Sequence, residues 1–242
     1  MPIPKVIHQT WKSKILPNEI ESVRALIAEN NPGYEMIVYD DADIDEFIRK
    51  NYDSEFYDAY SKLNIGAAKA DFWRYCVLYT HGGIYLDMDA DIVLPLDWLI
   101  KKDDTCILTR EKNPQYFNNW IMIAEKGHPI MLEALRQCVY NINNKTSTNI
   151  GLLTGPGPLT TAILKLMKPL YSRDVHLYNE PDEQLNKELN TSGPIRMRIY
   201  GYDMENFCSF KSEGSESLYT EQSHWVTDPS PIFKDSSVQK GT

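Results

Sequence analysis

The chain has 242 residues, of which 42% are hydrophobic and 24% are charged, which argues against a disordered or fibrous protein. Lys and Arg number 25 against 34 Asp and Glu, so the formal net charge is −9. Because phosphate backbones are bound by clustered Lys and Arg, this acidic balance argues against a nucleic-acid partner.

Short apolar runs alternate with longer helical patterns, which predicts an α/β fold. In the first half of the chain, strands are expected at 5–11, 34–39 and 84–86, and helices at 18–30, 42–51 and 63–81. Asn18, with Glu21 three residues later, is the expected N-cap of the first helix, and Gly82-Gly83 is expected to end the third. The aromatic stretch that ends at Tyr60 is expected to be irregular.

In the second half, strands are expected at 105–109, 120–124 and 195–200, and helices at 129–141 and 159–167. The last 35 or so residues are polar and are expected to form a loop. No linker divides the chain, so the sequence predicts a single domain.

The cysteines and the N-terminus bear on the cell compartment. No apolar run approaches the roughly 18 residues of a membrane span, and residues 1–6 contain no secretory apolar region. We therefore expect no transmembrane segment, and a cytoplasmic protein or one at the inner face of a membrane. The cysteines are far apart and lie in or beside apolar stretches, which predicts buried reduced thiols at Cys76, Cys106, Cys138 and Cys208.

The sharpest chemical feature is an acidic turn directly after the strand at 84–86. Asp87 and Asp89 project to the same side, because side chains alternate along an extended chain. Paired carboxylates at a strand end suit Mg²⁺ or Mn²⁺ shared with phosphate oxygens. The alternative is a solvated acidic turn, and the apolar strand after Gly82-Gly83 argues against it.

Two other kinds of site begin with the same acids. A calcium-binding EF loop fails, because its sixth and twelfth positions hold Ile92 and Trp98 in place of Gly and Glu. An aspartyl phosphatase of the DxDx(T/V) type would use the two acids as nucleophile and proton donor. Here Asp91 occupies the Thr/Val position and the motif lies far from the N-terminus, so this stays the runner-up.

The preceding helix carries a second charged pair. Asp71 and Arg74 lie three residues apart and share a helix face. The residues expected to form the buried face are Phe72, Tyr75, Cys76 and Tyr79. The charged pair is either a surface salt bridge or, close to the two carboxylates, a grip for a sugar hydroxyl by Asp71 and a phosphate by Arg74.

Three blocks in this order resemble the DXD-containing sugar-transferase family: IPKVIHQTW at 3–11, AKADFWRYCVLY at 68–79 and GGIYLDMD at 82–89. Segments at 119–124, 127–129 and 154–160 also resemble it, so the resemblance covers roughly residues 3–225. The family, glycosyltransferase family 32-like, includes initiating outer-chain mannosyltransferases and capsular polysaccharide glycosyltransferases, and more distantly clostridial glucosylating toxins.

The resemblance implies a GT-A fold, with a Rossmann-like mixed sheet flanked by helices. Residues of about 1–110 would form the nucleotide-sugar half, and about 111–225 the acceptor half with a C-terminal segment that completes the metal and diphosphate site. The implied donor is a nucleotide diphosphate sugar, with a UDP-sugar favoured over GDP-mannose. The implied metal is Mn²⁺, with Mg²⁺ as the alternative, and the acceptor is a glycan or lipid-linked saccharide. Transfer with retention is expected by resemblance.

The resemblance also implies roles for single residues. Trp11 would lie against the nucleotide base, and Tyr85 would flank the nucleotide. Asp71 would hold the donor sugar, and Arg74 its phosphate. Asp87 would contact ribose, sugar or metal-bound water, and the metal site is expected at Asp87 and Asp89, with Asp89 a direct ligand. The implied catalytic set is Asp71, Arg74, Asp87 and Asp89.

Further candidates lie nearer the ends of the chain. Trp225 would bind the diphosphate, and the third metal ligand is open among Glu221, Ser223 and His224, with His224 favoured. His8 and Gln9 belong to the first block, but a His at a strand end is more often a hydrogen-bonded structural residue. The Gly- and Pro-rich turn at 154–158 either lines the donor pocket or only shapes the helix after it.

Three functions follow from these residues. A metal-dependent glycosyltransferase is favoured, in which the metal, Arg74 and Trp225 stabilise the departing diphosphate and Asp71 orients the sugar. A metal-dependent phosphoryl enzyme such as a phosphatase would release inorganic phosphate from monoesters. A non-catalytic carbohydrate- or nucleotide-binding module of the same shape is the third, and the presence of all four acidic and basic site residues argues against it.

Overall fold

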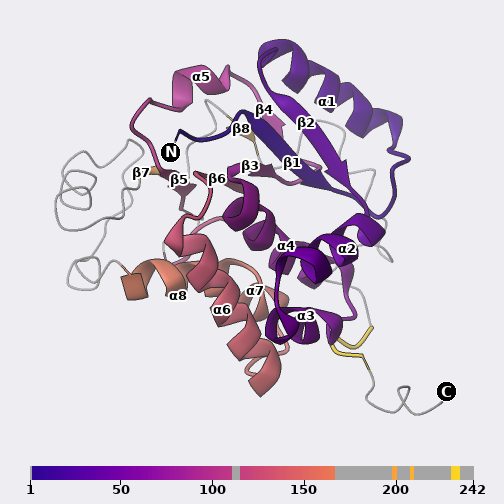
Figure 1. Ribbon diagram of the computed structural model, residues 1–242. Helices are drawn as coiled ribbons and strands as arrows, with labels where there is room; N and C mark the ends of the chain where they lie inside the picture. Colours follow the sequence, from indigo (N-terminus) through magenta and orange to yellow (C-terminus); the bar gives the residue numbers. More distant parts are fainter. Residues whose placement is uncertain (1, 111–114, 167–197, 201–207, 210–229, 235–242) are drawn as a thin grey trace.

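The computed structural model of the protein describes residues 2–110, 115–166, 198–200, 208–209 and 230–234. These residues form a mixed β-sheet with helices on both faces, so the α/β class predicted from the sequence is confirmed (Figure 1).

The main sheet determines where the strand ends meet. Its strands are β1 (Val6–Thr10), β2 (Glu35–Tyr39), β3 (Gly83–Leu86), β5 (Cys106–Thr109), β6 (Ile121–Ala124) and β7 (Arg198–Tyr200), in the order β2-β1-β3-β6-β5-β7. β1 is parallel to β2 and β3, β6 is antiparallel to β3 and β5, and β7 is parallel to β5. The carboxyl ends of β1 and β3 therefore lie at the same edge as the amino end of β6.

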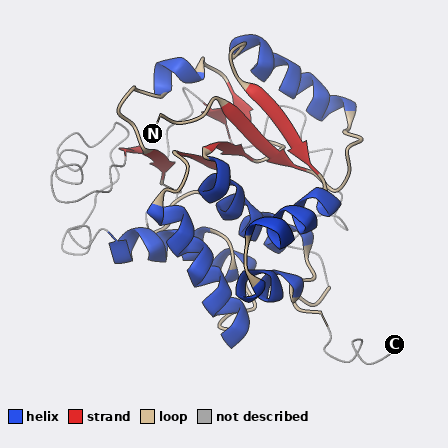
Figure 2. Cartoon of the chain, in the orientation of Figure 1, coloured by secondary structure: helices blue, strands red, loops and turns tan. Residues whose placement is uncertain are grey.

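Helices cover both faces of this sheet (Figure 2). They are α1 (Asn18–Asn30), α2 (Asp41–Asn51), α3 (Ser54–Ser61), α4 (Gly66–His81), α5 (Leu96–Leu99), α6 (Pro129–Asn144), α7 (Ile150–Leu153) and α8 (Pro156–Leu166). Ile84 and Ile123 of the sheet pack with Ile27 of α1, whereas their strand neighbours Tyr85 and Met122 pack into the core around α4 and α6. Alternation along each strand thus supplies both cores.

Helix α4 is the centre of the larger core. Its eight consecutive residues from Asp71 to Leu78 are all buried, and Tyr79 is half-buried. The prediction of a single buried face was therefore too narrow, because α2, α6, α7 and the sheet contact this helix on different sides. The consequence is that Asp71 and Arg74 are buried within the fold, and a surface salt bridge is excluded.

The turn from α4 into β3 requires glycine. Gly82 has a φ of +71° and caps α4, and Gly83 has a φ of +100° and begins β3. A Cβ on Gly82 would lie 2.5 Å from the backbone nitrogen of Lys126, and one on Gly83 would lie 2.6 Å from the carbonyl oxygen of Val6. The prediction that Gly82-Gly83 ends the helix is confirmed. Glycine at both positions allows the tight turn from α4 into β3 beside the neighbouring backbone.

Several predicted boundaries were wrong where the deciding contacts are distant in sequence. α4 begins at Gly66 and not at 63, because Leu63 forms a bridge with Phe233 and the Asn64 backbone N–H donates to the Ile232 carbonyl oxygen at 2.7 Å. The predicted C-terminal loop contains β8 (Cys208–Ser209), which pairs with β4 (Asp91–Ile92).

Local capping explains other differences. Pro17 and not Asn18 precedes α1, and α1 has no side-chain cap. The stretch expected to be irregular contains α3, whose N-cap Asp53 accepts from the backbone N–H of Glu55 and whose Tyr60 is buried in the core. α8 begins at Pro156 rather than at 159, since proline is tolerated in the first turn of a helix. α6 continues to Asn144, and the short α5 and α7 were not predicted.

Three of the four cysteines, Cys76, Cys106 and Cys138, are free and buried as predicted, and the Cys208 side chain is not described. Among the described residues, no helix has both the length and the apolarity to cross a membrane.

Candidate active site

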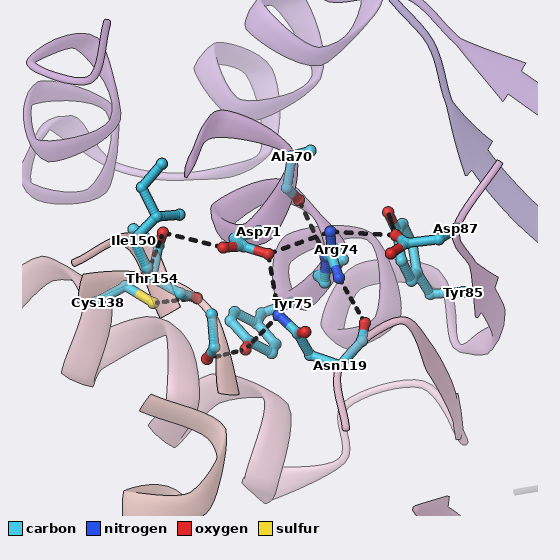
Figure 3. Close-up of polar contacts among 11 residues, drawn as sticks. Ala70, Asp71, Arg74, Tyr75, Tyr85, Asp87, Asn119, Cys138, Ile150 and Thr154 are labelled. Atoms are coloured by element: carbon cyan, nitrogen blue, oxygen red, sulfur yellow. Dashed lines mark hydrogen bonds and ion pairs between the residues drawn. The ribbon is translucent and has the colours of Figure 1, made fainter. Parts of the chain in front are cut away.

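Four segments bring polar side chains together at the strand edge described above. They are α4, the end of β3, the residues just before β6, and the corner between α7 and α8 (Figure 3). The backbone N–H of Asp87 donates to the carbonyl oxygen of Trp120 at 2.8 Å, which joins the end of β3 to the segment before β6.

Arg74 is the centre of this cluster and is only 5% exposed. Its Nη2 lies 3.1 Å from Oδ1 of Asp71 and 3.2 Å from Oδ1 of Asp87, and its Nη1 donates to the carbonyl oxygen of Asn119 at 2.6 Å. The guanidinium carbon lies 4.4 Å from the centre of the Tyr85 ring. Arg74 therefore shares its single positive charge between one acid on α4 and one acid at the end of β3.

Asp71 is held from three sides. Besides Arg74, Nδ2 of Asn119 donates to its Oδ1 at 2.9 Å, and the Thr154 hydroxyl donates to its Oδ2 at 3.2 Å. Burial raises the pKa of Asp71, and the Arg74 charge together with these two donors opposes that rise. The carboxylate has a fixed orientation, as hydrogen bonds to both oxygens require.

Asp87 is held from two sides. The Tyr85 hydroxyl donates to its Oδ1 at 2.6 Å, and Arg74 lies on the same oxygen. Burial raises the pKa of Asp87 to about 7; the Arg74 charge opposes the rise, and the nearby Asp89 charge adds to it. The Asp89 charge therefore opposes ionisation of Asp87, and a bound cation would relieve that repulsion.

Asp89 differs from the other acids of the cluster. It is 7% exposed, and within the described ranges no hydrogen bond or ion pair reaches its carboxylate. A buried carboxylate without a counter-charge is unfavourable, and hard oxygen ligands suit a divalent cation. Among the described residues, however, no group of three His, Cys, Asp or Glu could hold a metal. The described residues of this cluster thus offer a cation at most the two acids Asp87 and Asp89.

Residues 17–106, which include all of these acids and Arg74, match the family described as the glycosyltransferase sugar-binding region containing a DXD motif. Residues 17–106 belong to this family. The resemblance inferred from the sequence is thereby confirmed. The matched region contains the charged residues of the cluster, whereas Asn119 and Thr154 lie outside it.

Two relatives of this chain are named as mannosyltransferases. Inositol phosphoceramide mannosyltransferase 3 of Schizosaccharomyces pombe is 32% identical over 162 residues, which are 67% of this chain and 44% of that protein. The initiation-specific alpha-1,6-mannosyltransferase of Candida albicans is 25% identical over 210 residues, covering 69% of this chain and 54% of that protein. The chain thus spans about half the length of these relatives.

Among solved structures, the PaToxG glycosyltransferase superposes with a TM-score of 0.57 at 21% identity, covering 78% of this chain and 74% of that one. This likeness concerns the fold, and it confirms the GT-A architecture expected from the sequence.

The structure places the sequence-predicted residues of the sugar-binding family in two groups. Asp71, Arg74, Tyr85 and Asp87 form one contact network, and Asp89 lies beside it. Trp11 follows β1 and is half-buried; its backbone N–H donates to the Tyr39 carbonyl oxygen, and no contact joins its side chain to that network within the described residues. The C-terminal candidates Glu221, Ser223, His224 and Trp225 lie outside the described residues.

His8, in the first motif block, is a structural residue. Its Nε2–H donates to the Gly82 carbonyl oxygen at 3.0 Å, and its Nδ1 lies 3.4 Å from the Tyr39 hydroxyl. Burial lowers the pKa of His8 to about 4, so the ring is neutral near pH 7. The expectation of a hydrogen-bonded histidine at a strand end is confirmed.

Asn119 and Thr154 were not predicted as site residues. Both lie within segments that resemble the family, at 119–124 and 154–160, so that resemblance was the available indication. Their contacts with Asp71 span 48 and 83 residues of sequence, and no local pattern predicts contacts at that separation. The turn at 154–158 therefore does more than shape the start of α8.

Proposed function

We propose that the protein is a metal-dependent glycosyltransferase that moves a hexose from a nucleotide diphosphate sugar to a glycan or lipid-linked saccharide, with retention. The observation that carries the proposal is the buried Asp71–Arg74–Asp87 network beside Asp89. Within a sugar-binding region containing a DXD motif, this network joins a carboxylate suited to a sugar hydroxyl with two suited to a cation.

The donor is proposed from sequence and relatives together. The sequence favours a UDP-hexose, whereas the names of the relatives quoted above support mannose and therefore GDP-mannose. Both donors share the chemistry that the site addresses, namely a hexose on a nucleoside diphosphate. The sequence favours a glycan or lipid-linked saccharide as the acceptor, whereas the first relative's name supports an inositol phosphate headgroup on a ceramide lipid.

The proposed cation is Mn²⁺ or Mg²⁺ at Asp87 and Asp89. When bound, it would act as a Lewis acid that stabilises negative charge on the leaving diphosphate. The cation would also remove the electrostatic cost of the unpaired Asp89 carboxylate. The candidates for the remaining ligand stay those named from the sequence, Glu221, Ser223 and His224.

The chain's own residues would bind and orient the donor. Asp71, fixed by its hydrogen bonds, would accept from a hydroxyl of the hexose and hold the ring in one orientation. Arg74 would fix both acids and add positive charge next to the diphosphate. Tyr85, whose ring lies under the Arg74 guanidinium, would keep Asp87 aimed toward the cation through its hydroxyl.

Asp89→Asn tests the proposed function against Asp91→Asn, which changes the next acid along the chain. Asp91 is half-buried at the start of β4. We expect Asp89→Asn to abolish Mn²⁺-dependent release of hexose from UDP-glucose or GDP-mannose, at an unchanged melting temperature, and Asp91→Asn to retain it. Loss of one ligand of a shared cation removes charge stabilisation needed in the transition state.

Three results would contradict the proposal. Release of inorganic phosphate from monoesters would favour a phosphatase. Metal-dependent nucleotide binding without transfer or donor hydrolysis would favour a binding module. Full activity of Asp89→Asn would remove the DXD acid from the mechanism.

A further inference from the structure

The Asp71 carboxylate has one acceptor position that receives no donor from the described residues. Its Oδ1 receives two donors, Arg74 Nη2 at 3.1 Å and Asn119 Nδ2 at 2.9 Å, which occupy both lone pairs of that oxygen. Its Oδ2 receives the Thr154 hydroxyl at 3.2 Å and no other hydrogen bond from the described residues. One lone pair of Oδ2 therefore remains for a ligand.

Thr154 determines which lone pair stays open. Its side chain is fully buried, and its hydroxyl also lies 3.3 Å from the Ile150 carbonyl oxygen. The single hydroxyl proton is drawn to the nearer and charged acceptor, Asp71, because hydrogen bonds to ionised groups are the stronger ones. A valine at this position would have the same shape but would leave both lone pairs of Oδ2 without a donor.

The corner between α7 and α8, which carries Thr154, is held in place by hydrogen bonds to its backbone. The Thr154 backbone N–H donates to the Ile150 carbonyl oxygen at 2.9 Å, and the Tyr75 hydroxyl donates to the Gly155 carbonyl oxygen at 2.8 Å. A Cβ on Gly155 would lie 3.1 Å from Oδ2 of Asp71. A side chain at position 155 would therefore crowd Asp71, and glycine lets the corner lie close to the carboxylate that the Thr154 hydroxyl contacts (Figure 3).

We propose that Thr154 is a positioning residue: its hydroxyl directs Asp71 so that the remaining lone pair of Oδ2 accepts one hydroxyl of the donor hexose. The inference rests on the proposed function, because it specifies how that site holds the sugar. Thr154 acts through Asp71 and does not itself touch the sugar. Removing its hydroxyl therefore changes how the Asp71 carboxylate is oriented toward the sugar but leaves that carboxylate in place.

The test compares Thr154→Val with Thr154→Ser, which keeps the hydroxyl, and with Thr161→Val, which alters an exposed threonine on α8. Steady-state hydrolysis of UDP-glucose and GDP-mannose with Mn²⁺ gives kcat and KM. We expect Thr154→Val to lower kcat/KM about tenfold, mainly through kcat, as for the loss of one hydrogen bond to a charged group. Thr154→Ser should stay within about threefold of wild type, and Thr161→Val should equal it.

An Asp71→Asn background separates positioning from a general structural role. If Thr154 acts through Asp71, Thr154→Val costs less than about twofold in that background, because coupled residues are not additive. Equal losses in both backgrounds, or wild-type turnover by Thr154→Val, would overturn the inference. Thr154→Ala repeats the comparison if Val disrupts the corner.

The two proposals fail in different ways. A wild-type protein that turns over no UDP- or GDP-hexose contradicts the proposed function. An active wild type together with a Thr154→Val variant of unchanged kcat/KM contradicts only the positioning role of Thr154.

Discussion

Two regions that carry the same family resemblance differ in the structure: the block at 3–11, and the pair of blocks at 68–79 and 82–89. The block at 3–11 forms β1, and its His8 is neutral, buried and hydrogen-bonded to the fold. The blocks at 68–79 and 82–89 form α4 and β3. They bury the Arg74 guanidinium between Asp71 and Asp87, and among the described residues the Asp89 carboxylate has no ion-pair partner. A motif residue whose charge the fold leaves unpaired is therefore a candidate for binding or catalysis. A motif residue whose polar atoms are hydrogen-bonded within the fold is a structural residue.

We expect the largest change in stability from removing the positive charge of Arg74, in the region formed by α4 and β3. Arg74→Met leaves Asp71 and Asp87 buried without a counter-charge, which should cost about 3–5 kcal/mol of unfolding free energy. Urea unfolding at pH 7 measures it. The exposed Arg49→Met is the control and should stay within about 0.5 kcal/mol. A loss under about 1 kcal/mol for Arg74→Met would show that the two acids need no cation, and the contrast with β1 would disappear.

The next effect concerns the neutral residue of the first region. Burial lowers the pKa of His8 from its ordinary 6.5 to about 4. Between these values the unfolded chain binds the proton and the folded chain does not, so stability is full above about pH 6.5 and falls as the pH decreases toward 4. The contribution of this group is up to about 3 kcal/mol.

Substitution of His8 should therefore flatten this pH dependence. In unfolding experiments between pH 4 and 7, His8→Gln should lose less stability on acidification than wild type, with turnover per folded molecule unchanged near pH 7. The exposed His81→Gln should alter the slope less, because burial lowers the pKa of His81 only in part and its charge is the smallest of the causes at His8. Loss of turnover in folded His8→Gln would show that His8 on β1 takes part in the reaction and is not only a structural residue.

The smallest effect is expected from an ion pair on the surface of the first block. Lys5 Nζ lies 2.7 Å from Oδ2 of Asp97, and both side chains are more than half exposed. Because solvent screens such pairs, Lys5→Gln should change the unfolding free energy by less than about 0.5 kcal/mol. Thermal unfolding in low and high salt measures it, and a change comparable to that of Arg74→Met would mean that burial does not distinguish the two pairs.

The elements that sequence predicted well are those whose causes are local. α1 has the predicted bounds of 18–30, and the glycine pair ends α4 as expected. The adjacency of Asp71, Arg74 and Asp87 also follows from neighbouring elements, because a helix and the next strand joined by a tight turn bring their residues together.

The elements that sequence missed depend on distant contacts. The start of α4 is determined by pairing of Leu63 with Phe233, and the orientation of Asp71 by Asn119 and Thr154. Arg74 also differs from its expected setting, since its hydrogen-bonding groups are engaged by the protein itself in the described residues. Its contact with a donor phosphate stays a prediction, as do the roles of Trp11 and of the C-terminal candidates.

A cation held by the acids at the end of β3 would let a chain with a net charge of −9 bind an anionic diphosphate donor. Calorimetric titration of the full chain with UDP-glucose and GDP-mannose, with Mn²⁺ and with a chelator, tests it most directly. We expect at least one donor to bind with Mn²⁺ and this binding to be lost in the chelator. Binding of equal affinity without metal, or no binding of either nucleotide sugar with Mn²⁺, would contradict donor binding through a cation.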